Sequence, residues 1–471
     1  MKNYWILFIV LFPFYTFSQS VQLLYFTDAH QLYPLDDVQG TRGGIARLKT
    51  VVNDAKKDNK HTLTIHGGDF VGGVLYGGIY QGRHMIPAFN QIPVDYYNFG
   101  QHEFDYGLDH LQSLLKQAKG QFFTTNLVDE KELPLFNLPK YIVINTNGIR
   151  ILMIGLTDQM ETTKKDPRVH QADLYTSTQN IFDKIDSKSF DVIVAVTQMD
   201  LKKNKDLVQH FPQIDIVLTE ELEEYHTQIH YQNHRPIIAT AGNMSSVAKV
   251  ILSKNKKPLI EVISLDQSVE RDEKLKLLED SERKNVEDLL QEKLGELKMD
   301  LDAFESLKQE SLAGNLITDA MKDYYQTDLS IIDGSGIRKS VQKGDFTYEM
   351  VRTLLPYGNK MVVVKIKGED FQSFIHGYLT AEKSKLVQLS GAKYVWNTKS
   401  KELKFEDINP DKFYTLVLND YNFGKLQRYE EVIISADHKL SLPDYDVLKH
   451  YIKKNKIILP QYSNRIIINN E

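Results

Sequence analysis

The chain has 471 residues, 42% of them hydrophobic, which is enough for two or three domains with substantial buried cores. Its formal net charge of −6 offers no basic field to neutralise a phosphate backbone, which argues against a general nucleic-acid-binding protein. The absence of cysteine excludes disulfides and thiolate ligands, so any metal must be held by Asp, Glu, His, Asn or Gln.

The N-terminus has the pattern of a secretory signal peptide. Lys2 precedes an apolar run from Tyr4 to Phe17, and the small residues Thr16 and Ser18 favour a cut ahead of Gln19. The run is shorter than the ~20 residues that a membrane span requires, which favours a cleaved signal over an anchor. No later stretch is apolar and long enough to cross a bilayer. We therefore expect residues 1–18 to be a signal peptide and the mature chain to be secreted or periplasmic.

Three successive predicted strands end in ionisable residues. The apolar run Leu23–Thr27 leads into Asp28 and His30, Thr62–His66 leads into Gly67-Gly68-Asp69, and Val94–Tyr97 leads into Asn98-Phe99-Gly100-Gln101-His102-Glu103-Phe104-Asp105. Ligands gather at the carboxyl ends of strands in open α/β sheets. Carboxylate and imidazole groups converging there suit a divalent-metal site, although a lone His in a loop is more often a solvated surface residue.

Alternating strands and helices continue through the first half of the chain. Residues 43–57 and 108–119 have helical apolar spacing, and Thr146-Asn147-Gly148 predicts a hairpin between strands at 141–145 and 150–156. Further strands are expected at 191–197, 214–218, 237–241 and 247–252. This alternation suits two packed sheets with helices outside. The charged segment Ser268–Asp300 has spaced leucines, which predicts a bridging helical stretch.

The order of the motifs Asp-x-His, Gly-Asp and Gly-Gln-His-Glu-Phe-Asp resembles the calcineurin-like metallophosphoesterases, in particular the two-domain bacterial 5'-nucleotidase/UDP-sugar hydrolase family. The resemblance implies an α/β fold: a four-layer αββα catalytic sandwich over residues 19–265, a helical linker over 266–300, and a C-terminal α+β nucleotide-recognition domain over 301–471. The C-terminal motifs that carry it are Gly314–Ala320, Asp333–Arg338 and Leu355–Asn359.

The resemblance also implies roles for the strand-end residues. Asp69 would bridge two divalent metals, with Asp28 and His30 completing much of the first metal site. His102 would stabilise the transition state or protonate the leaving oxygen, and Asp105 would orient its ring.

The ligands of the second metal depart from the family pattern. Where relatives have Asn, His and a Gly-His-x-His or Gly-His-x-Gln motif, this chain has Gln101, Gln198 and Glu221-Leu222-Glu223. Either the site has decayed, or it has been rebuilt with oxygen donors. All four residues, Gln101, Gln198, Glu221 and Glu223, can coordinate, which favours a rebuilt site for Mg²⁺, Mn²⁺ or Ca²⁺ rather than Zn²⁺. A gapped alternative would use His226-Thr227-Gln228 instead.

In the C-terminal domain the family stacks a nucleobase between two aromatic rings. Tyr357 and Tyr421 match the rings, and Arg338 and Asn359 match the polar partners. Packing in the core or at its rim would explain the two tyrosines equally well. The Gly-Gly-Asp-Gly segment that relatives have after the second ring is replaced by Gly424-Lys425-Leu426-Gln427.

The predicted function is therefore an exported metal-dependent phosphoesterase that hydrolyses the 5'-phosphate of nucleotides. Its partner would be a small nucleotide rather than a nucleic acid, and it would use two divalent ions. The alternatives are a catalytically silent nucleotide-binding homologue, or a phosphodiesterase or nucleotide-sugar diphosphate hydrolase.

Overall fold

The computed structural model describes residues 20–37, 40–72, 75–158, 166–381, 386–426, 433–434 and 442–470. The chain forms two compact units, Met1–Lys284 and Asn285–Glu471. The signal peptide expected over residues 1–18 lies outside the described residues. Within the described part of the chain, no helix combines the length and apolarity that a membrane span needs.

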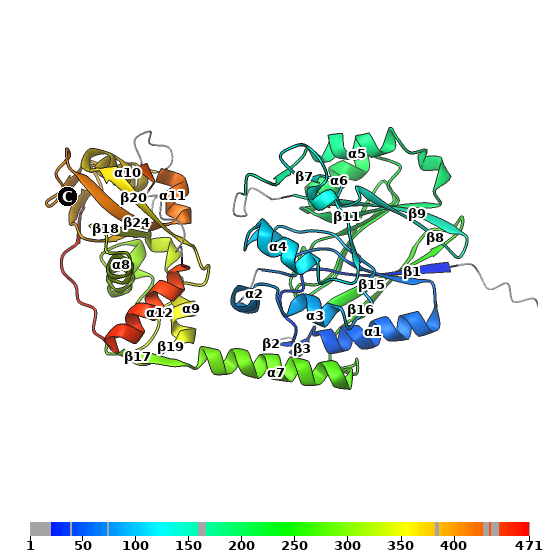
Figure 1. Ribbon diagram of the computed structural model, residues 1–471, viewed down its shortest axis with the longest axis horizontal. Coiled ribbons are helices and arrows are strands. Elements are labelled where there is room, and N and C mark those ends of the chain that lie inside the picture. Colours follow the sequence, from blue (N-terminus) through cyan, green and yellow to red (C-terminus); the bar gives the residue numbers. More distant parts are fainter. Residues whose placement is uncertain are drawn as a thin grey trace, which may run out of the picture. The chain divides into compact units, whose positions relative to one another are not determined.

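The N-terminal unit contains two six-stranded sheets (Figure 1). In the first, the strand order is β16-β15-β1-β4-β5-β6, with bounds Leu259–Ser264, Ser246–Ser253, Ser20–Phe26, Thr62–His66, Tyr96–Tyr97 and Gln121–Phe122. In the second, the order is β13-β14-β12-β11-β9-β8, with bounds Gln228–Gln232, Arg235–Ala239, Ile216–Thr219, Val192–Gln198, Ile149–Thr157 and Tyr141–Thr146.

The two sheets pack face to face. Alternate residues point inward, so that Leu23 and Tyr25 of β1 meet Val194 and Val196 of β11 in one buried cluster. The outer face of the second sheet is covered by α5 (Leu174–Phe182) and α6 (Leu201–His210), and α1 (Ile45–Asp58) packs against β4 of the first. The predicted four-layer αββα sandwich is confirmed.

Sheet pairing brings the loops that carry the candidate site residues to one edge. Strands β1, β4, β5 and β6 are parallel neighbours, and so are β9, β11, β12 and β14. The carboxyl ends of parallel strands therefore meet at the same edge of each sheet. The hairpin between β8 and β9 forms as predicted, because Asn147 and Gly148 adopt the positive φ angles, 50° and 74°, that a two-residue turn requires.

Smaller elements complete this unit. They are β2 (Leu35–Asp37), β3 (Gly40–Arg42), α2 (Leu75–Tyr80), α3 (Met85–Phe89), the 3-10 helix η1 (His102–Phe104), α4 (Leu108–Leu115), β7 (Leu127–Val128), η2 (Leu135–Asn137), β10 (His170–Gln171) and η4 (Ser187–Ser189).

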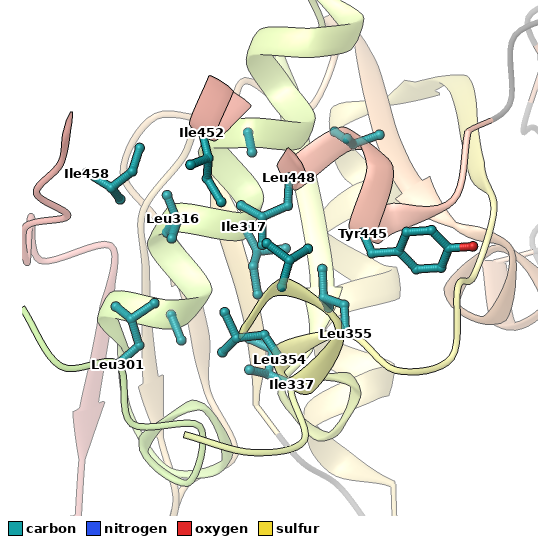
Figure 2. Close-up of a cluster of buried hydrophobic side chains, with 14 of the residues drawn as sticks. Leu301, Leu316, Ile317, Ile337, Leu354, Leu355, Tyr445, Leu448, Ile452 and Ile458 are labelled. Atoms are coloured by element: carbon teal, nitrogen blue, oxygen red, sulfur yellow. The ribbon is translucent and has the colours of Figure 1, made fainter. Parts of the chain in front are cut away.

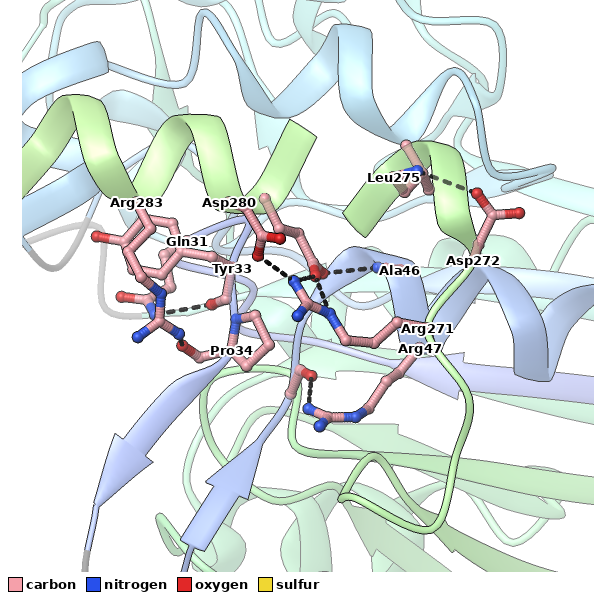
Figure 3. Close-up of polar contacts among 12 residues, drawn as sticks. Gln31, Tyr33, Pro34, Ala46, Arg47, Arg271, Asp272, Leu275, Asp280 and Arg283 are labelled. Atoms are coloured by element: carbon pink, nitrogen blue, oxygen red, sulfur yellow. Dashed lines mark hydrogen bonds and ion pairs between the residues drawn. The ribbon is translucent and has the colours of Figure 1, made fainter. Parts of the chain in front are cut away.

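Helix α7 (Glu273–Leu290) begins in the N-terminal unit and is anchored there (Figure 3). Its Glu279 is fully buried and accepts hydrogen bonds from the backbone N–H of Ala46, at 2.7 Å, and from Arg271. Arg283, one turn further on, donates to the carbonyl oxygen of Pro34 at 2.5 Å. These contacts fix the start of α7 to the segment that follows β1.

The sequence predicts helix across Ser268–Asp300, but the structure differs at its end. The helix stops at Leu290 and the strand β17 (Lys293–Leu297) follows, paired with β19 (Gly344–Thr347) and β26 (Ile457–Ile458). Leu294 and Leu297 are buried in the core of the C-terminal unit. Burial in that core, rather than helical periodicity, decides the local structure.

The C-terminal unit is a mixed α+β domain. Its five-stranded sheet has the order β21-β18-β24-β20-β25, with bounds Val387–Ser390, Leu329–Asp333, Phe413–Asn419, Met361–Lys367 and Ile433–Ile434. Figure 2 shows part of the core on one face, where α8 (Leu312–Tyr325), α9 (Tyr348–Leu354) and α12 (Asp444–Asn455) meet. Helix α10 (Gly368–Thr380) covers the other face.

The remaining elements of this unit lie around the sheet. They are η5 (Glu305–Leu307), η6 (Gly334–Gly336), β22 (Tyr394–Asn397), β23 (Leu403–Phe405), α11 (Asp420–Leu426) and β27 (Ile466–Asn469).

Candidate active site

A group of three potential metal ligands lies at the carboxyl edge of the N-terminal unit. Asp28 and His30 follow β1, Glu221 follows β12, and one ligand atom of each lies within 4.8 Å of the others. Asp28 and His30 are buried, and Glu221 is half-buried. The backbone N–H of Glu221 donates to the Asp28 carboxylate at 3.2 Å. The sequence analysis assigned Glu221 to the second metal; the structure brings it to the residues expected to hold the first.

Burial controls the protonation of this group. It raises the pKa of Asp28 to about 6, and it raises the pKa of Glu221 to about 8, with the charges of Asp28 and Glu224 adding to the effect. Burial also lowers the pKa of His30 to about 4, so its ring is neutral at physiological pH. A neutral imidazole can ligate a cation, and a cation would relieve the repulsion between the two carboxylates.

One of the two ring nitrogens of His30 already makes a hydrogen bond within the protein. Nδ1 donates to the carbonyl oxygen of Gly72 at 3.2 Å, which fixes the tautomer and leaves Nε2 for a ligand. Gly72 itself has no room for a side chain, because a Cβ there would lie 2.2 Å from Oδ2 of Asp105. A Cβ on Gly77 of α2 would in turn lie 2.5 Å from the Gly72 carbonyl oxygen. Gly72 therefore packs against the loop that carries His30, against Asp105 and against α2.

Helix α2 is tied to α7 within the same unit. The buried Tyr76 donates from its hydroxyl to Glu282 at 2.9 Å, and Nδ1 of His84 bonds to the same carboxylate oxygen, also at 2.9 Å. Arg283 of α7 also lies 5.1 Å from the centre of the Tyr33 ring, near the loop that carries Asp28 and His30. Helix α7 thus supports both segments beside the candidate ligands.

Asp69 sits on a tightly folded loop after β4. Its backbone has a positive φ of 57°, and its Oδ1 accepts from the backbone N–H of His102 at 2.8 Å. Gly100 must be glycine, because a Cβ there would lie 2.1 Å from Oδ1 of Asp69. Burial raises the pKa of Asp69 well above its usual range, and the neighbouring charge of Glu103 raises it further.

Glu103 is a residue of the candidate site that the sequence analysis did not single out. Its carboxylate is fully buried and accepts three backbone hydrogen bonds, from Gly100 at 2.6 Å, Phe70 at 2.7 Å and Asp69 at 2.9 Å. It therefore holds the loops after β4 and β5 together. Its place between His102 and Asp105 was a signal, but only the fold reveals which N–H groups it meets.

His102 and Asp105 form the expected pair. His102 donates from Nδ1 to Oδ2 of Asp105 at 2.8 Å, and both side chains are about a third exposed. Burial alone would lower the pKa of His102, but the bond to Asp105 and the charge of Asp69 outweigh it and raise the pKa to about 10. The rings of His102 and His30 lie edge to face with centroids 5.7 Å apart. The pair therefore adjoins the three-ligand group.

Gln198, at the end of β11, is almost fully buried. Its Nε2 donates to Oγ1 of Thr27, next to Asp28, at 2.8 Å. Its Oε1 has no hydrogen-bond partner among the described residues. A buried amide oxygen without a partner is costly unless a further group occupies its lone pairs, and a cation is one such group. Gln101 lies at the start of η1, directly before His102.

The remaining acidic candidate points elsewhere. Glu223 is bonded to Nδ1 of His226 at 2.9 Å and to Nε2 of Gln228 at 3.1 Å. The His226 side chain is 69% exposed. Glu223 and the gapped alternative His226-Thr227-Gln228 thus contact each other, and neither belongs to the group formed by Asp28, His30 and Glu221.

The four candidate nucleotide contacts lie in the C-terminal unit. Tyr357 is 61% exposed, and the guanidinium of Arg338 lies 5.6 Å from its ring centroid. Tyr421, at the start of α11, is 54% exposed. Asn359 is half-buried, and its carbonyl oxygen accepts from the backbone N–H of Asp444 at 2.9 Å. Exposed aromatic rings suit stacking on a nucleobase better than packing in a core.

Comparison with known proteins agrees with this arrangement. A family model described as the 5'-nucleotidase C-terminal domain matches residues 293–432. Endonuclease YhcR of Bacillus subtilis (strain 168) is 25% identical over 487 residues, covering 92% of this chain but only 39% of YhcR. The 5'-nucleotidase of Rattus norvegicus is 23% identical over 496 residues, covering 90% of this chain and 85% of the rat protein.

A solved structure shares the fold of the whole chain. The 5'-nucleotidase precursor from Thermus thermophilus superimposes with a TM-score of 0.65 at 22% identity, covering 96% of this chain and all of that one. The C-terminal unit therefore carries the domain described as the 5'-nucleotidase C-terminal domain, and the chain as a whole shares the fold of that solved 5'-nucleotidase precursor.

Proposed function

We propose that this protein is an exported, metal-dependent phosphoesterase that removes the 5'-phosphate from nucleotides. The observation that carries the proposal is the convergence of Asp28, His30 and Glu221 within 4.8 Å, beside the hydrogen-bonded pair His102–Asp105. Such a set of oxygen and imidazole donors next to a histidine held by a carboxylate suits hydrolysis of an anionic ester.

The residues present fit a divalent cation. Asp28, His30 and Glu221 would hold one ion. Asp69, whose pKa is also raised by the charge of Asp28, and Gln198, whose Oε1 has no hydrogen-bond partner among the described residues, would be further donors. A donor set with one imidazole and otherwise oxygen atoms favours Mg²⁺, Mn²⁺ or Ca²⁺ over Zn²⁺. When bound, such ions neutralise phosphoryl oxygens and lower the pKa of water.

The protein's own residues would supply the proton. The Nδ1–H of His102 is held by Asp105, and this bond raises the pKa of the ring against the effect of burial, which favours the protonated imidazole. The other ring nitrogen, Nε2, can then donate to a phosphoryl oxygen or protonate the leaving alkoxide. Glu103 keeps the loop that carries His102 in place through its three backbone hydrogen bonds.

The C-terminal unit would select the nucleoside. Tyr357 and Tyr421 offer exposed rings for stacking on any base, and Arg338 and Asn359 offer polar contacts. The names of relatives, which include a 5'-nucleotidase and an endonuclease, support activity on nucleotide esters in general. The choice of a nucleoside monophosphate rests on the likeness to the 5'-nucleotidase C-terminal domain.

The test is phosphate release from AMP by the full chain after chelation, with Mg²⁺, Mn²⁺, Ca²⁺, Zn²⁺ and Co²⁺ added back singly. His102→Ala is the active-site variant, and His226→Ala, an exposed histidine bonded to Glu223, is its matched control. We expect release that depends on added metal, that is lost in His102→Ala and that persists in His226→Ala.

Two other results would replace the proposal. Release from a cyclic nucleotide or a UDP-sugar, but not from AMP, would identify a phosphodiesterase or nucleotide-sugar hydrolase. Silence with every metal, together with retained binding of AMP, would identify a nucleotide-binding protein without catalysis.

A further inference from the structure

A single buried carboxylate connects two parts of the candidate nucleoside-binding face. Asp333 ends β18 and is 4% exposed. Its Oδ1 accepts from both the backbone N–H and the hydroxyl of Ser335, each at 2.7 Å. Ser335 lies in the short loop that leads to Arg338, whose backbone N–H is bonded to Leu354 at 3.0 Å. One oxygen of Asp333 therefore fixes the start of the loop that carries Arg338.

The other oxygen of Asp333 accepts a hydrogen bond from the hydroxyl of Tyr378, a buried residue of α10. Burial and the charge of Asp333 raise the pKa of Tyr378, so the phenol keeps the proton that it donates. The phenol oxygen accepts from Nζ of Lys425 at 2.7 Å and from Nδ2 of Asn422 at 3.1 Å. One donated and two accepted bonds use the full capacity of a hydroxyl group.

The two residues that donate to Tyr378, Lys425 and Asn422, belong to α11, the helix that also contains Tyr421. The backbone N–H of Asp333 also donates to Oδ1 of Asn422, at 3.4 Å. Nζ of Lys425 lies 3.6 Å from the Asp333 carboxylate. Helix α11 is thus attached to β18 and α10 by its polar side chains as well as by apolar packing.

The same ammonium group defines the environment of Tyr421. Nζ of Lys425 lies 4.2 Å from the ring centroid of Tyr378 and 4.4 Å from that of Tyr421. One face of the Tyr421 ring is therefore in contact with a cation, while about half of the residue stays exposed. Tyr357 has a similar environment, with Arg338 at 5.6 Å. Asp333 lies beside one of these two cations, Lys425, and contacts the loop that carries the other, Arg338, through Ser335.

We propose that Asp333 and Tyr378 form a positioning pair that sets the nucleoside-binding face of the C-terminal domain. Through Ser335 the pair holds the Arg338 loop, and through Asn422 and Lys425 it holds α11 and the ring of Tyr421. Lys425 covers one face of that ring and leaves the other for a nucleobase. This inference rests on the proposed function, because it takes the ligand to be a nucleoside or nucleotide.

The ordinary role of such a network is stability alone, so the test must separate binding from folding. Tyr378→Phe removes only the hydroxyl at the centre of the network. Tyr394→Phe is the matched control, because Tyr394 is a fully buried tyrosine of the same domain whose hydroxyl makes one hydrogen bond, to the carbonyl of Val387 at 3.1 Å. Asp333→Asn is a second variant, which keeps an acceptor for Ser335 but turns a donor toward Tyr378.

Three measurements on the full chain are compared. Calorimetric titration with adenosine reports on base binding without any catalysis. Turnover of AMP gives KM and kcat, and turnover of ribose 5-phosphate, which lacks a base, reports on the phosphoester site alone. We expect Tyr378→Phe and Asp333→Asn to weaken adenosine binding and raise the KM for AMP about ten-fold, the loss typical of one buried polar contact. Their kcat for AMP and their turnover of ribose 5-phosphate should match those of Tyr394→Phe.

Each contrary result has a distinct meaning. Equal adenosine binding by Tyr378→Phe and Tyr394→Phe would overturn the positioning pair, as would wild-type protein that does not bind adenosine. Parallel loss of AMP and ribose 5-phosphate turnover in Tyr378→Phe would also overturn it, since the effect would then be on folding. If the wild type binds adenosine but hydrolyses neither phosphate ester, the phosphoesterase proposal fails, and the titration still decides the role of the pair.

Discussion

The backbone N–H of Glu221 donates a hydrogen bond of 3.2 Å to the carboxylate of Asp28, 193 residues earlier in the chain. This contact joins the loop after β12, in one sheet, to the loop after β1, in the other. It places the Glu221 carboxylate beside Asp28 and His30, whereas the carboxylate of Glu223, two residues later, is bonded to His226 and Gln228. The two acids of one short loop therefore have different surroundings and different expected roles.

Glu221→Ala should weaken divalent-metal binding, while Glu223→Ala should not. Removing the Glu221 carboxylate takes one of three clustered donors from the site, and we expect the dissociation constant for Mn²⁺ to rise at least about ten-fold. Isothermal titration of the chelator-treated protein with Mn²⁺ measures this directly. Equal affinities in the two variants would show that the cluster is not the metal site.

Asp105→Asn should lower kcat for AMP about 100-fold with little change in KM, because an amide holds the His102 ring less firmly and no longer stabilises its protonated form. Asp109→Asn is the matched control, since Asp109 lies in the next helix, α4, and pairs with Arg168 on the surface. Steady-state kinetics with AMP measure kcat and KM for both variants. Similar kcat values would mean that Asp105 does not orient His102.

The sequence predicts most strands of the N-terminal unit, and the position of the motif residues at the ends of those strands, because both follow from local patterns. Parallel strands bring Asp28, Asp69 and His102 to one sheet edge, and glycines such as Gly100 stand where backbone and carboxylate approach closely. The strand β17 was missed because its leucines also fit a helical spacing, and only the core of the C-terminal unit distinguishes the two.

Partnerships between distant residues could not be predicted in the same way. Glu221 and Glu223 are chemically alike, and the fold alone decides which of them faces Asp28. Glu103 and Tyr378 likewise contact segments that are remote in sequence, so the sequence does not show which groups they meet.

Tyr76→Phe should reduce both stability and metal affinity. The substitution removes the hydrogen bond from Tyr76 to the buried Glu282 of α7 and keeps the bond from His84 to Glu282. Loss of this buried hydrogen bond should lower the free energy of unfolding by about 1–3 kcal/mol. Because α2 packs on Gly72, whose carbonyl oxygen holds His30, the dissociation constant for Mn²⁺ should rise as well. Tyr80→Phe, on the same helix with its ring stacked on His84, is the control. If thermal melts and Mn²⁺ titrations do not distinguish the two variants, the contact between Tyr76 and Glu282 does not support the metal ligand His30.

Asp444 gives a prediction about pH. Burial raises its pKa to about 8, and the negative charge of Asp420 adds to the effect, although the backbone N–H of Tyr445 opposes it. In the unfolded chain the same carboxyl has a pKa near ~3.9. Between these two values the folded state binds more protons than the unfolded state. The free energy of unfolding should therefore fall as the pH rises from about 4 to about 8.

Asp444→Asn should remove this dependence, because an amide stays neutral at every pH and can still accept from the N–H of Tyr445. At pH 4 the variant and the wild type should unfold at similar temperatures, since the native carboxyl is then protonated. At pH 8 the variant should be more stable, by up to about 5 kcal/mol for a shift of about four pKa units, because it avoids ionisation of a buried group. Scanning calorimetry across this range measures the difference, with Asp411→Asn, an exposed acid in the same domain, as control. A stability difference that does not grow with pH would mean that Asp444 is already ionised in the folded protein, with its charge balanced by the neighbouring Arg352.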